Sequence, residues 1–86
     1  MLILRSKSFK KRYQQLPQKI QIHVKERLAL LIQDEFHPLL NNHGLFGKYN
    51  GYRSINITGD YRALYKKLAD GSLKFTAVGT HSKLYK

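Results

Sequence analysis

The chain contains no cysteine, and only five of its 86 residues are acidic. The absence of cysteine excludes disulfide bonds and thiolate metal sites. Small secreted domains usually depend on such cross-links, so their absence favours the reducing cytoplasm. A site for two metal ions needs several clustered carboxylates, which five scattered acidic residues cannot easily supply. We therefore expect neither a metal ion nor another cofactor.

Long apolar runs are missing as well. A membrane-spanning helix needs about 20 consecutive apolar residues, and none of the apolar stretches approaches that length. The apolar start, Met1–Arg5, is too short for a signal peptide. We expect a cytoplasmic protein that makes no membrane contact. Its length predicts a single domain over residues 1–86 with a modest core.

What the chain has in excess is positive charge. Sixteen lysines and arginines give a formal net charge of +11. Residues 1–43 and residues 44–86 are both net positive, so the charge belongs to the folded domain and not to a tail. Such a surface can serve solubility alone, but its field also attracts polyanions at long range. We expect a nucleic acid partner, and an acidic protein that covers the basic surface.

The first half of the chain predicts a strand and a helical hairpin. Met1–Arg5 is aliphatic and predicts a short strand, after which Ser6 can cap a helix. Apolar residues then recur at helical spacing up to residue 16, and again from residue 17 to about residue 35. Pro17 suits the first turn of the second helix.

The second half predicts a loop, three strands and a tail. His37-Pro38 ends the second helix, and Asn41–Gly51 is a loop rich in glycine and asparagine. The expected strands are Tyr52–Thr58, Tyr61–Lys67 and Leu73–Val78, and Gly79 separates the last strand from the tail Thr80–Lys86. Alternation puts Arg53, Ile55 and Ile57 on one side of the sheet. The expected fold is α+β in the order β-α-α-β-β-β, with a helical hairpin packed on a small antiparallel sheet whose other face is solvated.

Cutting RNA without a metal ion has definite chemical needs. A base must take the proton of a ribose 2′-hydroxyl, and an acid must protonate the leaving 5′-oxygen. Histidine serves both purposes near neutral pH. His23 in the second helix and His37 at its end are best explained as structural. His43 in the loop and His81 after the last strand are each as well explained by structure as by chemistry.

Basic residues on the strands could bind phosphate. Arg53 and Arg62 lie within predicted strands, where they are either half-exposed structural residues or phosphate ligands. Lys48, Lys66 and Lys74 would widen the same positive surface.

Three segments carry a resemblance to a known family. Gly51–Ile57, Gly59–Lys66 and Val78–Tyr85 resemble the RelE/ParE superfamily of toxins, and the closing Gly-Thr-His-x-x-Leu-Tyr is similar to its YafQ branch. The resemblance implies a RelE-like fold and the toxin of a type II toxin–antitoxin pair. Such toxins are endoribonucleases that cut mRNA in the ribosomal A site, and a cognate antitoxin silences them.

The resemblance also implies roles for individual residues. His81 matches the main acid/base residue, and Tyr85 matches the aromatic residue that contacts the base beside the cut. Asp60 matches an acidic residue of the site, and His43 a loop histidine that assists. Asn56 stands where the YafQ pattern has a further histidine, so His43 becomes the preferred second proton-transfer residue. The expected contacts to RNA are Arg53, Arg62, Lys48, Asn56, Lys66 and Lys83.

Two other functions remain open at this point. A ParE-like toxin of the same fold would inhibit DNA gyrase and cut nothing, since fold does not fix function. Such an inhibitor has no need of a histidine in its tail, which argues against this alternative. A catalytically inactive member that only binds RNA is the second alternative, because Asn56 cannot shuttle a proton near neutral pH.

Overall fold

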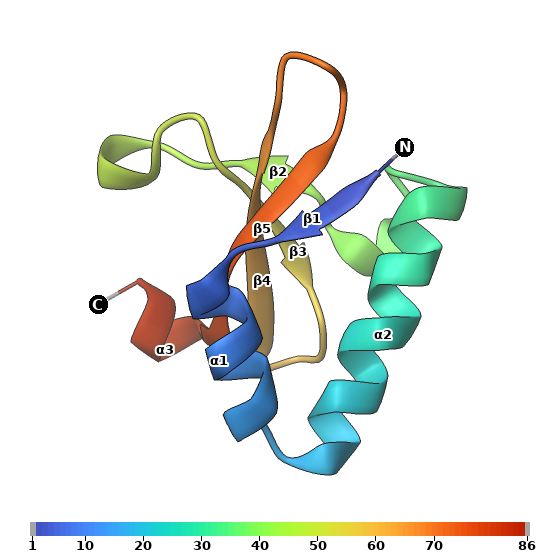
Figure 1. The fold of residues 1–86 in the computed structure, drawn as a ribbon, viewed down its shortest axis with the longest axis vertical. Helices are drawn as coiled ribbons and strands as arrows, with labels where there is room; N and C mark the ends of the chain where they lie inside the picture. Colours follow the sequence, from blue (N-terminus) through green and yellow to red (C-terminus); the bar gives the residue numbers. More distant parts are fainter. Residues whose placement is uncertain (1, 86) are drawn as a thin grey trace.

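The computed structural model describes residues 2–85, which form a five-stranded sheet with two long helices packed on one face (Figure 1). The longer elements are β1 (Ile3–Arg5), α1 (Lys7–Gln15), α2 (Gln18–Gln33), β3 (Arg53–Asn56), β4 (Tyr61–Lys67) and β5 (Leu73–Thr80). The short ones are η1 (Pro38–Leu40), β2 (His43–Gly44), η2 (Gly47–Tyr49) and α3 (His81–Leu84). The α+β class and the order of the six longer elements are confirmed. Met1 and Lys86, expected in the first strand and the tail, lie outside the described residues.

The sheet differs from the expected antiparallel meander in two ways. Its order is β1-β5-β4-β3-β2, and β1 pairs with β5 in parallel. Parallel pairing is possible because the helical hairpin and the following strands separate β1 from β5 and return the chain in the same direction. The strand β2 forms inside the expected loop and pairs with β3. Two residues are too few to show an alternating pattern, so periodicity misses this strand.

The end of the chain also differs from the expectation. Gly79 does not end the last strand, because β5 continues to Thr80, which pairs with Tyr61. The residues after it form the helix α3 instead of an irregular tail. A Cβ at Gly79 would lie 3.8 Å from the Leu84 side chain. This is an ordinary van der Waals distance, so Leu84 of α3 packs over Gly79 on the sheet.

The core lies between the helices and one face of the sheet. Phe9, Val24 and Leu31 come from the helices, and each is at most 1% exposed. They join one cluster with strand residues that include Ile55, Ile57, Ala63, Tyr65 and Phe75. The first helix begins where expected, because the Ser6 hydroxyl accepts a hydrogen bond from the Phe9 N–H at 3.1 Å.

The other face of the sheet, here called the outer face, is only partly solvated. Ser54 and Leu64 point away from the core cluster, yet they are 0% and 1% exposed. The loop with η2 and the helix α3 both lie on the left of the sheet in Figure 1, away from α2. This corrects the expectation of a fully open face. Within residues 2–85, no helix is long and apolar enough to cross a membrane.

Candidate functional site

The turn between β3 and β4 meets the start of α3 at one end of the sheet. Asp60, Thr80, His81 and Ser82 line a surface hollow of about 370 Å³ there. The N–H of His81 donates a hydrogen bond to the carbonyl of Asp60 at 2.8 Å. The β4–β5 pairing prepares this contact, because it places Tyr61 opposite Thr80. Two of the expected site residues, Asp60 and His81, therefore border the same hollow.

The helix α3 carries His81 and Tyr85 on one side. The Thr80 hydroxyl caps this helix and accepts a hydrogen bond from the Lys83 N–H at 3.4 Å. Residues four apart on a helix are neighbours, and the His81 and Tyr85 rings have centroids 4.6 Å apart at a tilt of 49°. The side chain of His81 is exposed and that of Tyr85 is half-buried. The expected pair of an acid/base group and a stacking ring is thus brought together.

His43 lies on the short strand β2, away from His81. It is opposite Ser54, and its Nδ1 is 2.8 Å from the carbonyl oxygen of Asn41. A carbonyl only accepts hydrogen bonds, so Nδ1 carries the hydrogen and Nε2 of the neutral ring is free to accept a proton. Strands lie about 4.8 Å apart, so β2 and β5, three positions apart, are separated by about 14 Å. His43 is not among the residues that line the hollow with His81.

Arg62 and Asn56 are neighbours on the outer face, between β2 and the hollow. They lie opposite one another on β4 and β3. Nη1 of Arg62 donates to the carbonyls of Thr58 and Gly59 at 2.9 and 3.0 Å. The guanidinium therefore braces the turn that carries Asp60. Oδ1 of Asn56 is buried and has no hydrogen-bond partner among residues 2–85.

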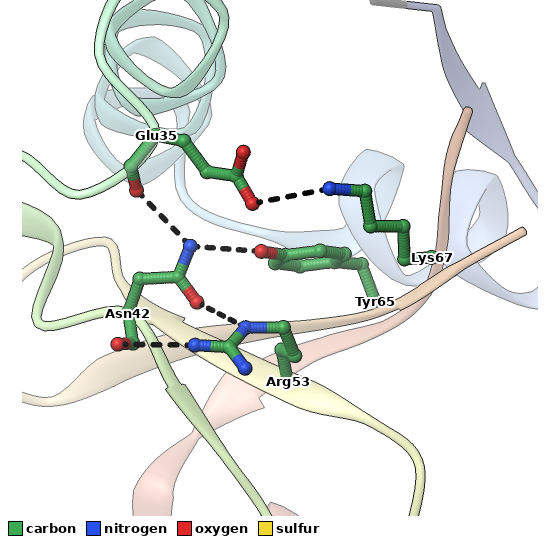
Figure 2. A network of polar contacts seen from close by, with 5 residues as sticks. All are labelled: Glu35, Asn42, Arg53, Tyr65 and Lys67. Carbon is green, nitrogen blue, oxygen red and sulfur yellow. Dashed lines mark hydrogen bonds and ion pairs between the residues drawn. The ribbon is translucent and has the colours of Figure 1, made fainter. Parts of the chain in front are cut away.

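Arg53 lies on the helix side of the sheet, so the two strand arginines do not share a face. Figure 2 shows its guanidinium against Asn42, where Nε donates to Oδ1 at 2.8 Å. Nδ2 of Asn42 donates in turn to the Tyr65 hydroxyl at 2.8 Å and to the Glu35 carbonyl at 3.0 Å. Lys67 reaches the Glu35 carboxylate at 3.8 Å. This network fixes Asn42, and with it the adjacent strand that holds His43.

The Tyr65 hydroxyl is kept neutral inside this network. Burial raises the pKa of Tyr65, while the hydrogen bond from Asn42 and the charge of Arg53 act in the opposite direction. Arg53 therefore contacts both Asn42 and the surroundings of the Tyr65 hydroxyl.

The expected lysines lie beside tyrosines that the sequence pattern did not single out. Nζ of Lys48 is 5.3 Å from the centroid of the Tyr49 ring, and Nζ of Lys66 is 5.7 Å from that of Tyr52. Tyr49 lies in the expected loop rich in glycine and asparagine, and the sequence predicts Tyr52 only as the first residue of a strand. Lys83 is exposed on α3. Within residues 2–85, no three histidine, cysteine or acidic side chains group as metal ligands.

Replacing Asn42 tests the network of Figure 2. Asn42→Ala leaves the Arg53 guanidinium and the Tyr65 hydroxyl without their shared partner, so we expect the free energy of unfolding to fall by about 1–3 kcal/mol. Urea denaturation measures this change. Asn50→Ala, at an exposed loop position, is the control and should have almost no effect. Equal stability of the two variants would contradict the structural importance of the network.

Comparison with known proteins gives one family. A sequence model described as the bacterial toxin of a type II toxin–antitoxin system, YafQ, matches residues 1–86. The crystal structure of YafQ from Escherichia coli strain BL21(DE3) is similar at 29% sequence identity and a TM-score of 0.79, covering 98% of this chain and 97% of that one. No curated protein sequence matches significantly.

Solved complexes of such toxins are similar too. YafQ in the Escherichia coli DinJ–YafQ complex has 27% identity and a TM-score of 0.73, with 98% of this chain and 97% of that chain covered. The RelBE2 toxin–antitoxin complex of Mycobacterium tuberculosis contains a chain with 21% identity and a TM-score of 0.75, covering 93% of this chain and 96% of that one. At that lower identity the likeness shows the fold alone.

Proposed function

The chain belongs to the YafQ family of bacterial toxins of type II toxin–antitoxin systems, and from this membership we propose that it is an endoribonuclease that cuts mRNA in the ribosomal A site. The observation that carries the proposal is the placement of His81 at a hollow that Asp60 also borders, with the Tyr85 ring against the His81 ring. Three chemical types, an imidazole, a carboxylate and an aromatic ring, lie at one end of a basic surface. We place the protein in the cytoplasm, where ribosomes and mRNA are found.

The proposed reaction is a transesterification within the RNA, in which phosphorus exchanges its bond to the 5′-oxygen for a bond to the 2′-oxygen. A base removes the proton of the 2′-hydroxyl, the 2′-oxygen attacks the adjacent phosphorus, and an acid protonates the departing 5′-oxygen. His81 takes one of these two proton transfers. The Tyr85 ring holds the neighbouring base by stacking, a contact worth about 1–3 kcal/mol.

The positions of Asp60 and His43 suggest which residue makes the second proton transfer. Asp60 borders the same hollow, whereas His43 lies on a strand three positions away. We therefore assign the second proton transfer to the Asp60 carboxylate and place His43 beside the RNA strand next to the cut. Arg62 follows Asp60 on β4 and its guanidinium contacts the turn before Asp60, where its charge offsets the charge that develops on the phosphate. Lys48, Lys66 and Lys83 guide the RNA by charge.

Removing the imidazole of His81 tests the proposal directly. His81→Ala should lower the rate of mRNA cleavage on programmed ribosomes by about 10²–10⁴, because it removes a general acid or base. Far-UV circular dichroism should show an unchanged fold, since the side chain is exposed. His23→Ala, on α2 and outside the hollow, should cut at the wild-type rate.

Two results would contradict this assignment. Equal cleavage by wild type and His81→Ala would exclude His81 from the chemistry. Intact message with wild-type protein would refute the nuclease, and trapped gyrase–DNA complexes in that case would favour the gyrase-inhibiting alternative.

Asn56 offers a gain-of-function test. Asn56→His puts an imidazole next to Arg62 on the outer face, so we expect cleavage to become several-fold faster. Asn50→His, in the exposed loop, is the control. An unchanged rate in Asn56→His would mean that this position takes no part in proton transfer. An inactive wild type beside an active Asn56→His would support the inactive RNA-binding alternative.

We also propose a surface for the cognate antitoxin. A groove of about 270 Å³ runs between α1 and α2. Its apolar lining is Phe9, Tyr13, Val24 and Leu28, and its charged lining residues are Arg5, Lys10 and Lys25. An apolar floor whose charged lining residues are all basic complements an amphipathic segment with acidic flanks. Complexes of similar toxins with antitoxins support a protein partner of this kind.

Reversing the charge of the rim tests the groove. The double variant Lys10→Glu/Lys25→Glu should weaken antitoxin binding about tenfold or more at low salt, and the difference should shrink as salt screens the charges. Isothermal titration calorimetry measures the affinity. The double variant Lys11→Glu/Lys19→Glu, on α1 and α2 outside the groove, changes the net charge equally and is the control. Equal affinity of the double variant and wild type would place the antitoxin elsewhere.

A further inference from the structure

We propose that Tyr49 is a positioning residue that holds the end of α3 on the outer face and thereby aims Tyr85 and His81. The inference rests on the proposed function, because it assigns Tyr49 a part in the same site. Tyr49 lies in η2, far from α3 in the sequence, and is half-buried. None of the motifs that pointed to the family includes it.

Two contacts join Tyr49 to the end of the chain. Its hydroxyl donates a hydrogen bond to the carbonyl of Leu84 at 2.6 Å. Its ring meets the Tyr85 ring edge to face, with centroids 5.9 Å apart and an interplanar angle of 83°. Edge-to-face pairs are a preferred aromatic geometry. One side chain thus fixes both the backbone and the ring at the end of α3.

The helix α3 needs such an anchor because of its length. It has four residues, and a helix that short is not stable by itself. The bonds from Thr80 and Asp60 secure only its beginning. Carbonyls at a helix end lack partners within the helix, and Tyr49 satisfies the one at Leu84.

Tyr49 acts on the hollow through Tyr85. The Tyr85 ring contacts Tyr49 on one side and the His81 ring on the other, at 5.9 and 4.6 Å between centroids. Movement of Tyr85 therefore alters the surface on which a base would stack and one wall around the imidazole. A misplacement of about 1 Å at a reacting group can slow a reaction about 10²-fold.

The anchor is itself held in place. Tyr52 meets the Tyr49 ring edge to face at 6.5 Å and 86°, and its N–H donates to the Tyr49 carbonyl at 3.0 Å. Gly51 has a φ of +91°, a conformation open mainly to glycine. The Leu45 N–H closes the loop by donating to the Tyr52 carbonyl at 2.9 Å. The loop therefore presents Tyr49 in one orientation.

Three variants separate the two contacts. Tyr49→Phe removes only the hydroxyl, and Tyr49→Leu removes the hydroxyl and the ring. Tyr13→Phe is the matched control, because it removes a tyrosine hydroxyl that donates to the Gln21 carbonyl at 3.3 Å between α1 and α2. NMR resonances of the Tyr85 and His81 rings should shift in both Tyr49 variants and stay in place in Tyr13→Phe. Unshifted resonances in Tyr49→Leu would overturn the proposal.

Single-turnover cleavage on programmed ribosomes tests the consequence. Tyr49→Phe should slow the cutting step about tenfold and Tyr49→Leu about 10²-fold, with unchanged affinity for the ribosome. In a Tyr85→Leu background the same changes should cost almost nothing, because Tyr49 acts through Tyr85. Equal losses in both backgrounds, or a loss of affinity alone, would overturn the proposal and make Tyr49 a direct RNA contact. A wild type that cuts nothing refutes the nuclease, and the NMR shifts then still decide whether Tyr49 holds the tail.

Discussion

The pairing of β4 with β5 is the constraint on which the candidate site depends. The two strands run antiparallel from Lys67 and Leu73 to Tyr61 and Thr80, with one irregularity beside Leu64. At their end the His81 N–H bonds to the Asp60 carbonyl at 2.8 Å. A slip of one residue would turn every side chain of a strand to the other face. Because Val78 and Phe75 are buried on the helix side, the core fixes the register and so fixes where the hollow forms.

The two faces of the sheet divide stability from chemistry. The helix side holds the core and the network around Asn42. In this network Arg53 binds Asn42, the residue before the two-residue strand β2. The outer side holds His81, Tyr85 and Arg62, braced by a turn and by a short helix. Neither β2 nor α3 is long enough to persist alone. Both depend on side chains from distant segments, so the outer face is a surface assembled by tertiary contacts.

This dependence explains how much could be predicted from the sequence. The helices and longer strands follow from the spacing of Phe9, Tyr13 and the residues after them, because local periodicity reports which face is buried. The closing motif around His81 points to the family in combination with the segments Gly51–Ile57 and Gly59–Lys66. Alternation also puts Arg53 on the side of Ile55 and Ile57, but only the pairing of Arg62 with Asn56 shows that Arg62 lies on the other face. The contacts of Tyr49 with Leu84 and of Arg53 with Asn42 join distant positions, and no local pattern encodes them.

The two candidate histidines come from different parts of the sheet. His43 lies on β2 and His81 begins α3 directly after β5, and these two strands are three positions apart in the sheet. His81 shares its hollow with Asp60 and not with His43. The most direct measurement is primer extension on mRNA from programmed ribosomes, with wild type and His81→Ala side by side. The proposed mechanism predicts defined cuts with wild type and almost none with the variant. Intact mRNA with wild type, or the same cuts from both proteins, would contradict it.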